Sequence, residues 1–459
     1  MLKKTALFLL FVFIIQAVLI IPAAATTGFR DLAAKSAILA ERENGIILYE
    51  NNATLRHPAD SLTKIMTLLL AVYAIESDEI SDNEIITMTE AAWHDMTEDS
   101  PTLDIYPGEE MTFIDLMYSA YVGNANEACN MLALRISGNI TSFVTLMNNT
   151  AREIGAENTR FMNPHGEYHD SQYTTARDLL LIFSEALNSP LFMEISGTFR
   201  HITESTEEFE SRTMTSSNAL INPSSRYYNR YCLSGRDSGT YEGGHSAVSY
   251  AEEDGLSLIS IILGSDVHIL EDESAEMRNF TETLRMYQWG FSQFSWRDIL
   301  KTTDLLARVE VLHGSGADFV NARPAESLSL LLDNSIPIEE FERRITIFSA
   351  RRNEPLVAPI NAGDVLGEVV ITRDGEEIAR VDLVANTSIN LSGVEYIRGQ
   401  VSDLLATNTA RNVIIVLAAL LILYIVLVVR YNIVRANRLR RIKNAKNDII
   451  RERHQNFRD

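Results

Sequence analysis

The sequence of 459 residues has only two cysteines, Cys129 and Cys232, too few for a disulfide framework or a cysteine-rich zinc site. The two thiols either pair or stay free, and the sequence is compatible with both. A basic surplus is also lacking, since 40 Lys and Arg face 62 Asp and Glu for a formal charge of −22. This excludes a protein that binds nucleic acid over its whole surface. Internal repeats and low-complexity tracts are absent too, and a hydrophobic content of 46% is enough for two or three domains with cores.

The first 25 residues have the layout of a secretory signal. Lys3 and Lys4 precede an apolar run over residues 6–21, and Pro22-Ala23-Ala24-Ala25 supplies an Ala-x-Ala cleavage site. An uncleaved membrane anchor is the alternative, but the run is short and ends in small residues. We therefore expect residues 1–25 to be a signal peptide and the protein to be exported.

The C-terminal part of the chain predicts one membrane span. Residues 413–429 form an uninterrupted apolar stretch of 17 residues, at the short limit for a helix that crosses a bilayer, and we assign the transmembrane helix to 412–430. Residues 430–459 carry ten basic and three acidic residues, a net charge of +7. The positive-inside rule places the tail, 431–459, in the cytoplasm, where it contacts anionic lipid.

Charge is therefore segregated along the chain. Without the tail and the two leader lysines, residues 26–429 carry −31. We expect a single-pass protein of the cell membrane, with an acidic extracytoplasmic ectodomain and a basic cytoplasmic tail. Nucleic acid is not an expected partner.

Between these ends, residues 26–292 predict a domain of alternating helices and strands. Asn44-Gly45 lies between two apolar runs and indicates a β-hairpin. Apolar helices are predicted over 61–76 and 113–136, and a buried strand over 256–263.

The character of the sequence then changes to short β-rich runs. They extend from Val309 to about Val384, with turns such as Asp374-Gly375, and indicate a small all-β domain assigned to 293–390. Residues 391–411 are polar and predict a juxtamembrane stalk.

Ser61 and Lys64 are the first candidates for catalysis. Ser61-Leu62-Thr63-Lys64 begins an apolar helix, and residues three apart share a helix face. A hydroxyl nucleophile needs a base within hydrogen-bond reach, and a lysine in a dry site serves when burial and a nearby cation lower its pKa. Taken alone, Ser-x-x-Lys also fits the start of a surface helix, because chains of this length contain it by chance.

Further motifs extend this pattern over nearly the whole ectodomain. In chain order they are Gly45-Ile46-Ile47-Leu48-Tyr49-Glu50, His57-Pro58-Ala59-Asp60-Ser61-Leu62-Thr63-Lys64-Ile65-Met66-Thr67, Pro107-Gly108-Glu109, Asn163-Pro164-His165-Gly166, Thr174-Thr175-Ala176-Arg177-Asp178, Ser217-Asn218, Asp254-Gly255-Leu256, Ala358-Pro359 and Gly367-Glu368. In these motifs the chain resembles the penicillin-binding D-alanyl-D-alanine carboxypeptidases, serine peptidases that trim the stem peptides of peptidoglycan.

The resemblance implies a fold and a reaction. The fold is an α/β (α+β) serine-peptidase domain of the β-lactamase-like transpeptidase type, followed by a small all-β domain and one C-terminal transmembrane helix. Ser61 would attack the penultimate D-Ala carbonyl with Lys64 as general base, and water would resolve the acyl-enzyme. The backbone N–H groups of Ser61 and of the strand near Thr240 would hold the oxyanion.

The same resemblance implies the ligands. The stem pentapeptide is the expected substrate and β-lactams are the expected acylating inhibitors, with no cofactor. A metal site is not expected either, because Pro164 and Gly166 make a loop of the segment that holds His165 and His169. Asp60 stands where the family usually has a small residue, and we interpret it as a helix N-cap.

The family's second motif, Ser-x-Asn, is altered. Its Ser helps to pass a proton to the leaving group, and its Asn binds substrate. Alignment over residues 122–128 places Asn124 at the Ser position and retains Asn126. An asparagine donates and accepts hydrogen bonds but cannot relay a proton as a hydroxyl does. An ordinary polar helix start is the alternative interpretation.

The third motif, Lys-Thr-Gly, is also altered, and two registers are open. Without gaps, Arg236 takes the place of the lysine and Asp237 that of the threonine; with one deletion, Ser238-Gly239-Thr240 matches Thr-Gly-Thr and Asp237 replaces the lysine. An arginine there could clamp the substrate's terminal carboxylate, whereas an aspartate would repel it. We take Arg236, Ser238 and Thr240 as the substrate-binding candidates.

Two functions follow from these alterations. The first is a membrane-anchored serine D-Ala-D-Ala carboxypeptidase with Ser61, Lys64, Asn124 and Asn126 as catalytic residues. The second is a catalytically impaired homologue that binds wall peptide or serves as a scaffold. It would follow if Asp60 and Asp237 lay close to Lys64 and kept it charged, because a charged lysine cannot take the proton of Ser61.

Overall fold

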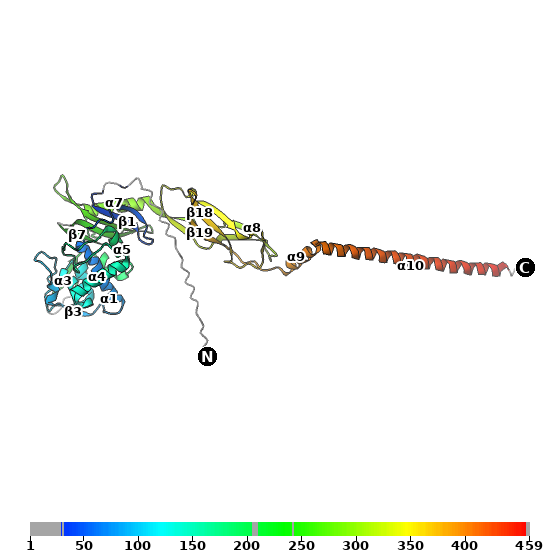
Figure 1. Cartoon of the computed structure of the whole chain (residues 1–459), viewed down its shortest axis with the longest axis horizontal. Coiled ribbons are helices and arrows are strands. Elements are labelled where there is room, and N and C mark those ends of the chain that lie inside the picture. The colour runs from blue at the N-terminus through cyan, green and yellow to red at the C-terminus, as the bar shows by residue number, and fades with distance from the viewer. Residues whose placement is uncertain (1–28, 30–31, 204–209, 241–242, 456–459) are drawn as a thin grey trace, which may run out of the picture. The chain divides into compact units, whose positions relative to one another are not determined.

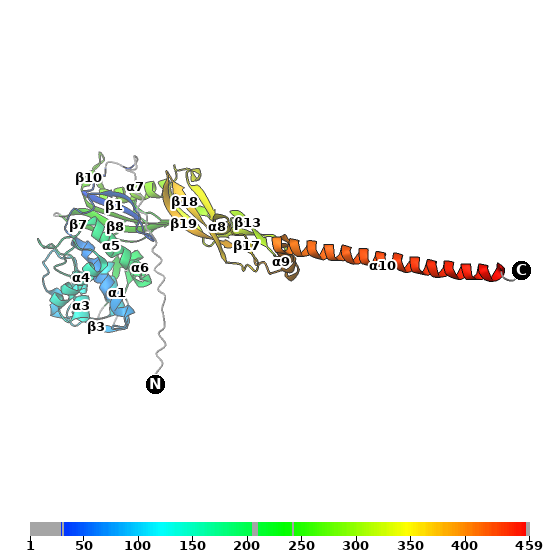
Figure 2. The ribbon, with the colours of Figure 1, turned by 45° about the vertical axis from the view of Figure 1, so that its right-hand side comes forward.

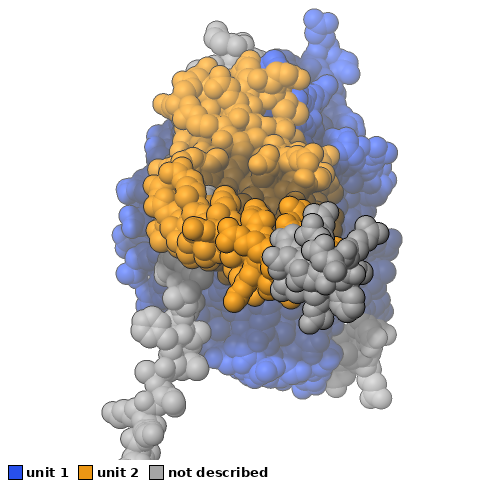
Figure 3. Space-filling model, turned by 90° about the vertical axis from the view of Figure 1, so that its right-hand side faces the viewer, with its two compact units in different colours: residues 1–297, 330–337 blue, residues 298–329, 338–459 orange. Residues whose placement is uncertain are grey.

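The computed structural model describes residue 29 and residues 32–203, 210–240 and 243–455, so the predicted signal peptide lies outside the described residues. The chain divides into two compact units, coloured separately in Figure 3. The first unit comprises Met1–Arg297 with Leu330–Pro337, and the second comprises Asp298–Ser329 with Ile338–Asp459.

An antiparallel five-stranded sheet organises the first unit. Its strand order is β2-β1-β9-β8-β7, so β7 lies at an edge. The predicted hairpin at Asn44-Gly45 is confirmed, because it joins β1 to β2. The predicted buried strand is β9, in which all ten residues are buried. The strands are β1 Ser36–Glu41, β2 Ile47–Asn51, β7 Cys232–Thr240, β8 Gly244–Glu253 and β9 Leu256–Ser265.

Helices cover both faces of this sheet, which explains why β9 is apolar on both sides. Helix α7 (Arg278–Gln293) packs on one face, and α5 (Ala176–Ala186) packs on the other (Figures 1 and 2). A helical layer extends beyond α5 and contains α1 (Lys64–Glu76), α4 (Ile140–Ile154) and α6 (Pro190–Gly197). Ten of the thirteen residues of α1 are buried, as expected for a helix that runs through the core.

The predicted helix over 61–76 begins with a 3₁₀ turn, η1 (Asp60–Thr63), and continues as α1. The prediction of one continuous helix over 113–136 is wrong. Two helices occur there, α2 (Phe113–Tyr121) and α3 (Asn126–Ser137). Asn124 between them has a left-handed φ of 58°, which no helix continues through. Apolar residues recur on both sides of the break, so periodicity alone does not reveal it.

Short elements complete the first unit. They are η2 (Glu90–Trp93) and three two-stranded ribbons: β3 (Ile85–Thr87) with β4 (Glu110–Thr112), β5 (Arg200–Ile202) with β6 (Thr213–Thr215), and β10 (Val267–Ile269) with β11 (Ala275–Met277).

The second unit confirms the predicted β-rich domain. Its six-stranded sheet has the order β16-β18-β19-β14-β13-β17. The predicted turn Asp374-Gly375 joins β18 to β19, with φ values of 52° and 82° that suit a tight hairpin. The strands are β13 Ala307–Leu312, β14 Phe319–Pro324, β16 Glu342–Ile347, β17 Leu356–Val357, β18 Val365–Arg373 and β19 Glu376–Ala385. Two short helices, η3 (Ile338–Glu340) and α8 (Phe348–Arg352), also belong to this unit. A two-stranded ribbon pairs β12 (Phe294–Leu300) with β15 (Leu328–Asp333), and each of these strands includes residues assigned to both units.

Two helices end the chain. Most of the segment predicted as a stalk forms α9 (Gly393–Ala406), whose Tyr396 ring contacts that of His313 edge-on at 5.6 Å. Helix α10 (Asn408–Gln455) contains the predicted span and most of the basic tail. Within it, residues Arg411–Ala445 are long and apolar enough to cross a membrane.

Candidate active site

Lys64 is the buried centre of the candidate site. Its side chain is only 1% exposed, although it belongs to a residue type that is rarely buried. The Nζ atom donates to Asn126 Oδ1 and to the backbone oxygen of His165, both at 2.7 Å. Ser61 lies one turn earlier in η1 and is half-buried. Three segments distant in sequence therefore meet at the lysine.

The environment of Lys64 makes its neutral amine more accessible than in an ordinary lysine. Burial lowers the pKa of Lys64 to about 8, and the guanidinium of Arg236 acts in the same direction. The carboxylates of Glu167 and Glu127 oppose this shift, as a thiolate at Cys129 would. A neutral amine has two N–H donors and one lone pair, and the two acceptors named above match the two donors. The lone pair is then left to accept a proton.

The two aspartates that raised doubt about Lys64 are directed elsewhere. Asp60 Oδ2 accepts a hydrogen bond from Thr240 Oγ1 at 2.8 Å, and Asp237 Oδ1 accepts one from Ser217 Oγ at 2.6 Å. The largest influences on the pKa of Lys64 come from burial and from other side chains. Each carboxylate is thus hydrogen-bonded to a hydroxyl group, and its effect on the charge of Lys64 stays a prediction.

The interpretation of Asp60 as an N-cap is wrong. Ala59 occupies the N-cap position of η1 and Thr63 that of α1, and neither cap uses a side-chain hydrogen bond. Asp60 lies inside the 3₁₀ turn with a left-handed φ of 43°. Its carboxylate points to the end of β7 instead.

Both asparagines of the altered second motif face the site, with different partners. Asn126 is 2% exposed at the start of α3, and its amide also approaches Glu167 Oε2 at 3.5 Å. Asn124 Oδ1 accepts a hydrogen bond from the guanidinium of Arg236. Asn126 thus contacts Lys64 directly, whereas Asn124 acts on it through Arg236.

The alternation of β7 distinguishes the two registers of the third motif. Arg236, Ser238 and Thr240 point to the face of β7 that meets the end of α2, Asn124 and η1. Asp237 points to the opposite face. The strand's cation on the site face is therefore Arg236, as in the register without gaps.

Arg236 is deeply buried, with 3% exposure. Its guanidinium donates to the backbone oxygen of Tyr121 and to Asn124, and lies 5.2 Å from the centre of the Tyr121 ring. Protein acceptors thus occupy these donors. The buried position suits an electrostatic influence on Lys64 better than an open clamp for a substrate carboxylate.

Ser238 and Thr240 continue the same face toward η1. Ser238 is buried, and its Oγ has no hydrogen-bond partner among the described residues. Thr240 Oγ1 donates to Asp60 and accepts from the backbone N–H of Gly243 at 2.8 Å. The candidate residues of the third motif therefore line one continuous wall.

The loop Asn163-Pro164-His165-Gly166 contributes more than sequence reasoning assigned to it. It supplies the backbone oxygen that binds Lys64, and burial lowers the pKa of His165 to about 3, so its ring is neutral. Gly166 has φ 93°, and a Cβ there would lie 1.9 Å from the backbone oxygen of Asp60. In the sequence, Gly166 is the one local signal that this loop lies so close to the backbone of Asp60.

Glu167 is the second group that sequence reasoning missed. It accepts hydrogen bonds from Ser100 Oγ at 2.5 Å and from Thr97 Oγ1 at 3.1 Å. These hydroxyls and Asn126 surround the carboxylate near Lys64. No local pattern in the sequence identifies this cluster.

Both cysteines are free and buried, which decides between the two alternatives. Cys129 lies in α3 and Cys232 in β7. Burial raises the pKa of both thiols, so both are neutral at physiological pH.

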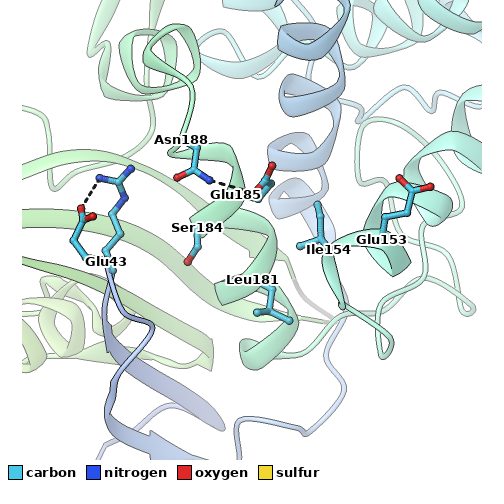
Figure 4. A pocket seen from close by; sticks show the side chains of 8 residues that line it. Glu43, Glu153, Ile154, Leu181, Ser184, Glu185 and Asn188 are labelled. Carbon is cyan, nitrogen blue, oxygen red and sulfur yellow. Dashed lines mark hydrogen bonds and ion pairs between the residues drawn. The ribbon is translucent and has the colours of Figure 1, made fainter. Parts of the chain in front are cut away.

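A separate hollow of about 480 Å³ in the first unit contains none of these candidates (Figure 4). Arg42 pairs with Glu43 on one side of it, and Asn188 donates to Glu185 on another. Its lining has one serine and three glutamates but no lysine, histidine or cysteine that could serve a nucleophile. It is lined by Arg42, Glu43, Glu153, Ile154, Leu181, Ser184, Glu185 and Asn188.

Comparison with known families matches both folded parts. Residues 23–267 match the family described as D-alanyl-D-alanine carboxypeptidase, and residues 299–390 match the C-terminal domain of penicillin-binding protein 5. The chain belongs to the D-alanyl-D-alanine carboxypeptidase family, as the motifs indicated.

Curated relatives agree with this assignment over most of their length. The chain is 26% identical over 373 residues to the D-alanyl-D-alanine carboxypeptidase DacF of Bacillus subtilis, covering 81% of this chain and 90% of that protein. It is 26% identical over 365 residues to the carboxypeptidase DacC of Escherichia coli, covering 78% and 85%.

Two solved structures share the fold. Penicillin-binding protein 5 of Haemophilus influenzae has a TM-score of 0.57 at 24% identity, covering 79% of this chain and 99% of that structure. Penicillin-binding protein 6B of Escherichia coli has a TM-score of 0.59 at 21% identity, covering 79% and 98%. The family assignment favours the serine carboxypeptidase over the impaired wall-binding homologue.

The effect of Arg236 on the pKa of Lys64 predicts how acylation depends on pH. Acylation of Ser61 by a fluorescent penicillin should accelerate as pH rises through about 8, because Lys64 then loses its proton. Arg236→Gln removes a cation that lowers the pKa of Lys64, so the midpoint should move to higher pH. The rate is measured on the detergent-solubilised chain from about pH 6 to about pH 10.

Arg230→Gln is the matched control, since Arg230 is exposed and precedes β7. Its midpoint should equal that of the wild type. An unchanged midpoint in Arg236→Gln would contradict the electrostatic role of Arg236.

Proposed function

We propose that this protein removes the terminal D-Ala of peptidoglycan stem pentapeptides through an acyl-enzyme on Ser61. The observation that carries the proposal is the pair of hydrogen bonds from Lys64 Nζ to Asn126 and to the His165 backbone. They match the donors of a neutral amine one helical turn from a half-buried serine. A nucleophile and its general base need an arrangement of this kind.

In the acylation half, Lys64 takes the proton of Ser61 as Oγ attacks the penultimate D-Ala carbonyl carbon. The tetrahedral intermediate then collapses, and the bond from this carbon to the nitrogen of the terminal residue breaks. The ammonium of Lys64 returns its proton to that nitrogen, so D-Ala leaves as the free amino acid. Ser61 now carries the acyl group as an ester.

In the deacylation half, a water molecule enters the place that the departed D-Ala has left. Lys64 accepts a proton as the water oxygen attacks the ester carbonyl, and the proton returns to Ser61 Oγ when the ester bond breaks. The site is restored and the shortened peptide leaves. No cofactor or metal enters either half.

The remaining candidates support this chemistry from the walls of the site. Asn126 orients Lys64, and Asn124 holds Arg236 near it. The peptide substrate would lie along the free edge of β7, between Ser238 and Thr240 and the turn of η1, in the manner of an added strand. The backbone N–H groups of Ser61 and Thr240 would share the oxyanion.

The test of this function is labelling that depends on Ser61. The full chain in detergent should bind a fluorescent penicillin covalently, and Ser61→Ala should lose the label, because the acyl bond forms on Oγ. Release of D-Ala from a synthetic stem pentapeptide should show the same dependence. Ser184→Ala, a serine in the hollow of Figure 4, is the matched control and should keep both activities.

Absence of label in a folded wild-type chain would contradict the proposal and would favour the impaired wall-binding homologue. Label without release of D-Ala would locate the defect in deacylation. Circular dichroism of each variant confirms that the comparison is between folded proteins.

We also propose the orientation of the chain in the cell membrane, with the two folded units outside and the basic end of α10 inside. Support comes from the apolar span in α10 and from the net charge of +7 that follows it. The acidic units would then work at the outer face of the membrane, where stem peptides are cross-linked.

Thiol labelling of intact cells tests this orientation, because both native cysteines are buried. A membrane-impermeant maleimide should label Ala325→Cys, an exposed position in the second unit, without permeabilisation. It should label Asn444→Cys in α10 only after permeabilisation. The reverse pattern would contradict the proposed orientation.

A further inference from the structure

Asp60 is the residue of the site that has no role in the reaction described above. It immediately precedes Ser61, it is 4% exposed, and its φ is 43°. Aspartate enters the left-handed region more readily than most residues, and the contacts of Asp60 described below stabilise it there. We propose that Asp60 is a positioning residue whose hydrogen bond to Thr240 sets the spacing of the two oxyanion-binding N–H groups. This inference rests on the proposed function, with Ser61 as nucleophile.

The hydrogen bond joins two segments that are 180 residues apart in sequence. Thr240 is the last residue of β7, the edge strand, and Asp60 is the first residue of η1. The Thr240 hydroxyl donates to Asp60 Oδ2 at 2.8 Å and accepts from the backbone N–H of Gly243 at 2.8 Å. The hydroxyl is thus fixed from both sides and ties the end of the strand to the turn of the nucleophile.

Close packing on Asp60 shows that this arrangement leaves little room for movement. A Cβ at Gly166 would lie 1.9 Å from the backbone oxygen of Asp60, and a Cβ at Gly243 would lie 2.0 Å from its Oδ2. The backbones of two different segments therefore press against the main chain and the carboxylate of one residue. Glycine is required at position 166, where φ is also 93°, whereas a side chain at position 243 would displace the Asp60 carboxylate.

The backbone of Asp60 determines where the first oxyanion donor points. The peptide group between Asp60 and Ser61 is planar, so the direction of the Ser61 N–H follows from the dihedral angles of Asp60. We take the second donor to be the N–H of Thr240, which moves with the end of β7. One oxygen must accept from both at about 2.7–3.1 Å, so the separation of the two donors has to be fixed.

The hydrogen bond between the side chains of Thr240 and Asp60 connects the two donors. Asp60 determines the direction of the Ser61 N–H, and Thr240 carries the second N–H. The hydrogen bond acts as an acceptor–donor link, not through charge, because a carboxylate close to a developing oxyanion would repel it. The amide of asparagine has an acceptor oxygen in the same place without the charge. Asparagine at position 60 should therefore preserve the function, whereas alanine should not.

The test measures the acylation rate of the full chain in detergent with a fluorescent penicillin, resolved into an affinity and a first-order acylation step. Asp60→Ala and Thr240→Val should each slow the acylation step by about 10- to 100-fold with little change in affinity, since misplaced donors fail only in the transition state. The double variant should be no slower than either single variant, because both remove the same link.

Conservative variants separate positioning from a general structural effect. Asp60→Asn and Thr240→Ser retain the link and should stay within about 3-fold of wild type. Asp254→Ala is the matched control, an exposed aspartate with φ 50° in the turn between β8 and β9, and it should acylate normally. If Asp60→Ala does not fold, Thr240→Val at the half-buried strand end carries the test.

Three results would overturn the proposal: a normal acylation step in Asp60→Ala or Thr240→Val, additive losses in the double variant, or an Asp60→Asn variant as slow as the alanine. Failure of the proposed function is a different result, because the wild-type chain would then take up no label. The acylation rates of the variants are compared with that of the wild type only once the wild type has been shown to acylate.

Discussion

Burial of the Lys64 side chain is the constraint on which the rest of the site depends. An ammonium group away from water costs several kcal/mol unless it loses its proton or finds partners. Asn126 and the backbone of His165 supply acceptors for two N–H groups, and burial shifts the equilibrium toward the neutral amine. Three separate segments thus meet at the Nζ atom of Lys64: α1, the start of α3 and the loop around Pro164.

The acidity of the chain does not prevent a lowered pKa at Lys64, because burial is the largest influence and outweighs nearby carboxylates such as Glu167. Residues 26–429 carry −31, and within the site Asp60, Asp237 and Glu167 each accept hydrogen bonds from hydroxyl groups. Arg236 provides the cation near Lys64 that the family motif normally obtains from a lysine. Its hydrogen bond to Asn124 joins the two altered motifs directly.

Much of the fold follows from local patterns in the sequence. The hairpin at Asn44-Gly45, the buried strand β9 and the apolar helix after Ser61 are each specified by short-range signals. The sequence left open two alignments of β7 with the Lys-Thr-Gly motif. A shift of one residue decides whether Arg236 or Asp237 takes the place of the lysine, and these two side chains point to opposite faces of the strand. The hydrogen-bond partners of Lys64 and Asp60 could not be predicted either. Lys64 donates to a backbone oxygen, and Asp60 accepts from a hydroxyl 180 residues away, and neither contact leaves a pattern in the sequence.

The protonation of Lys64 tests the account most directly. The chain has only seven lysines, so carbon-13 labelling of their side chains gives few NMR signals, and a Lys64→Gln variant assigns the one that matters. The account predicts that Lys64 titrates near pH 8, well below the ordinary lysine value of about 10.5. Titration of Lys64 together with the exposed lysines near 10.5 would contradict its role as the general base.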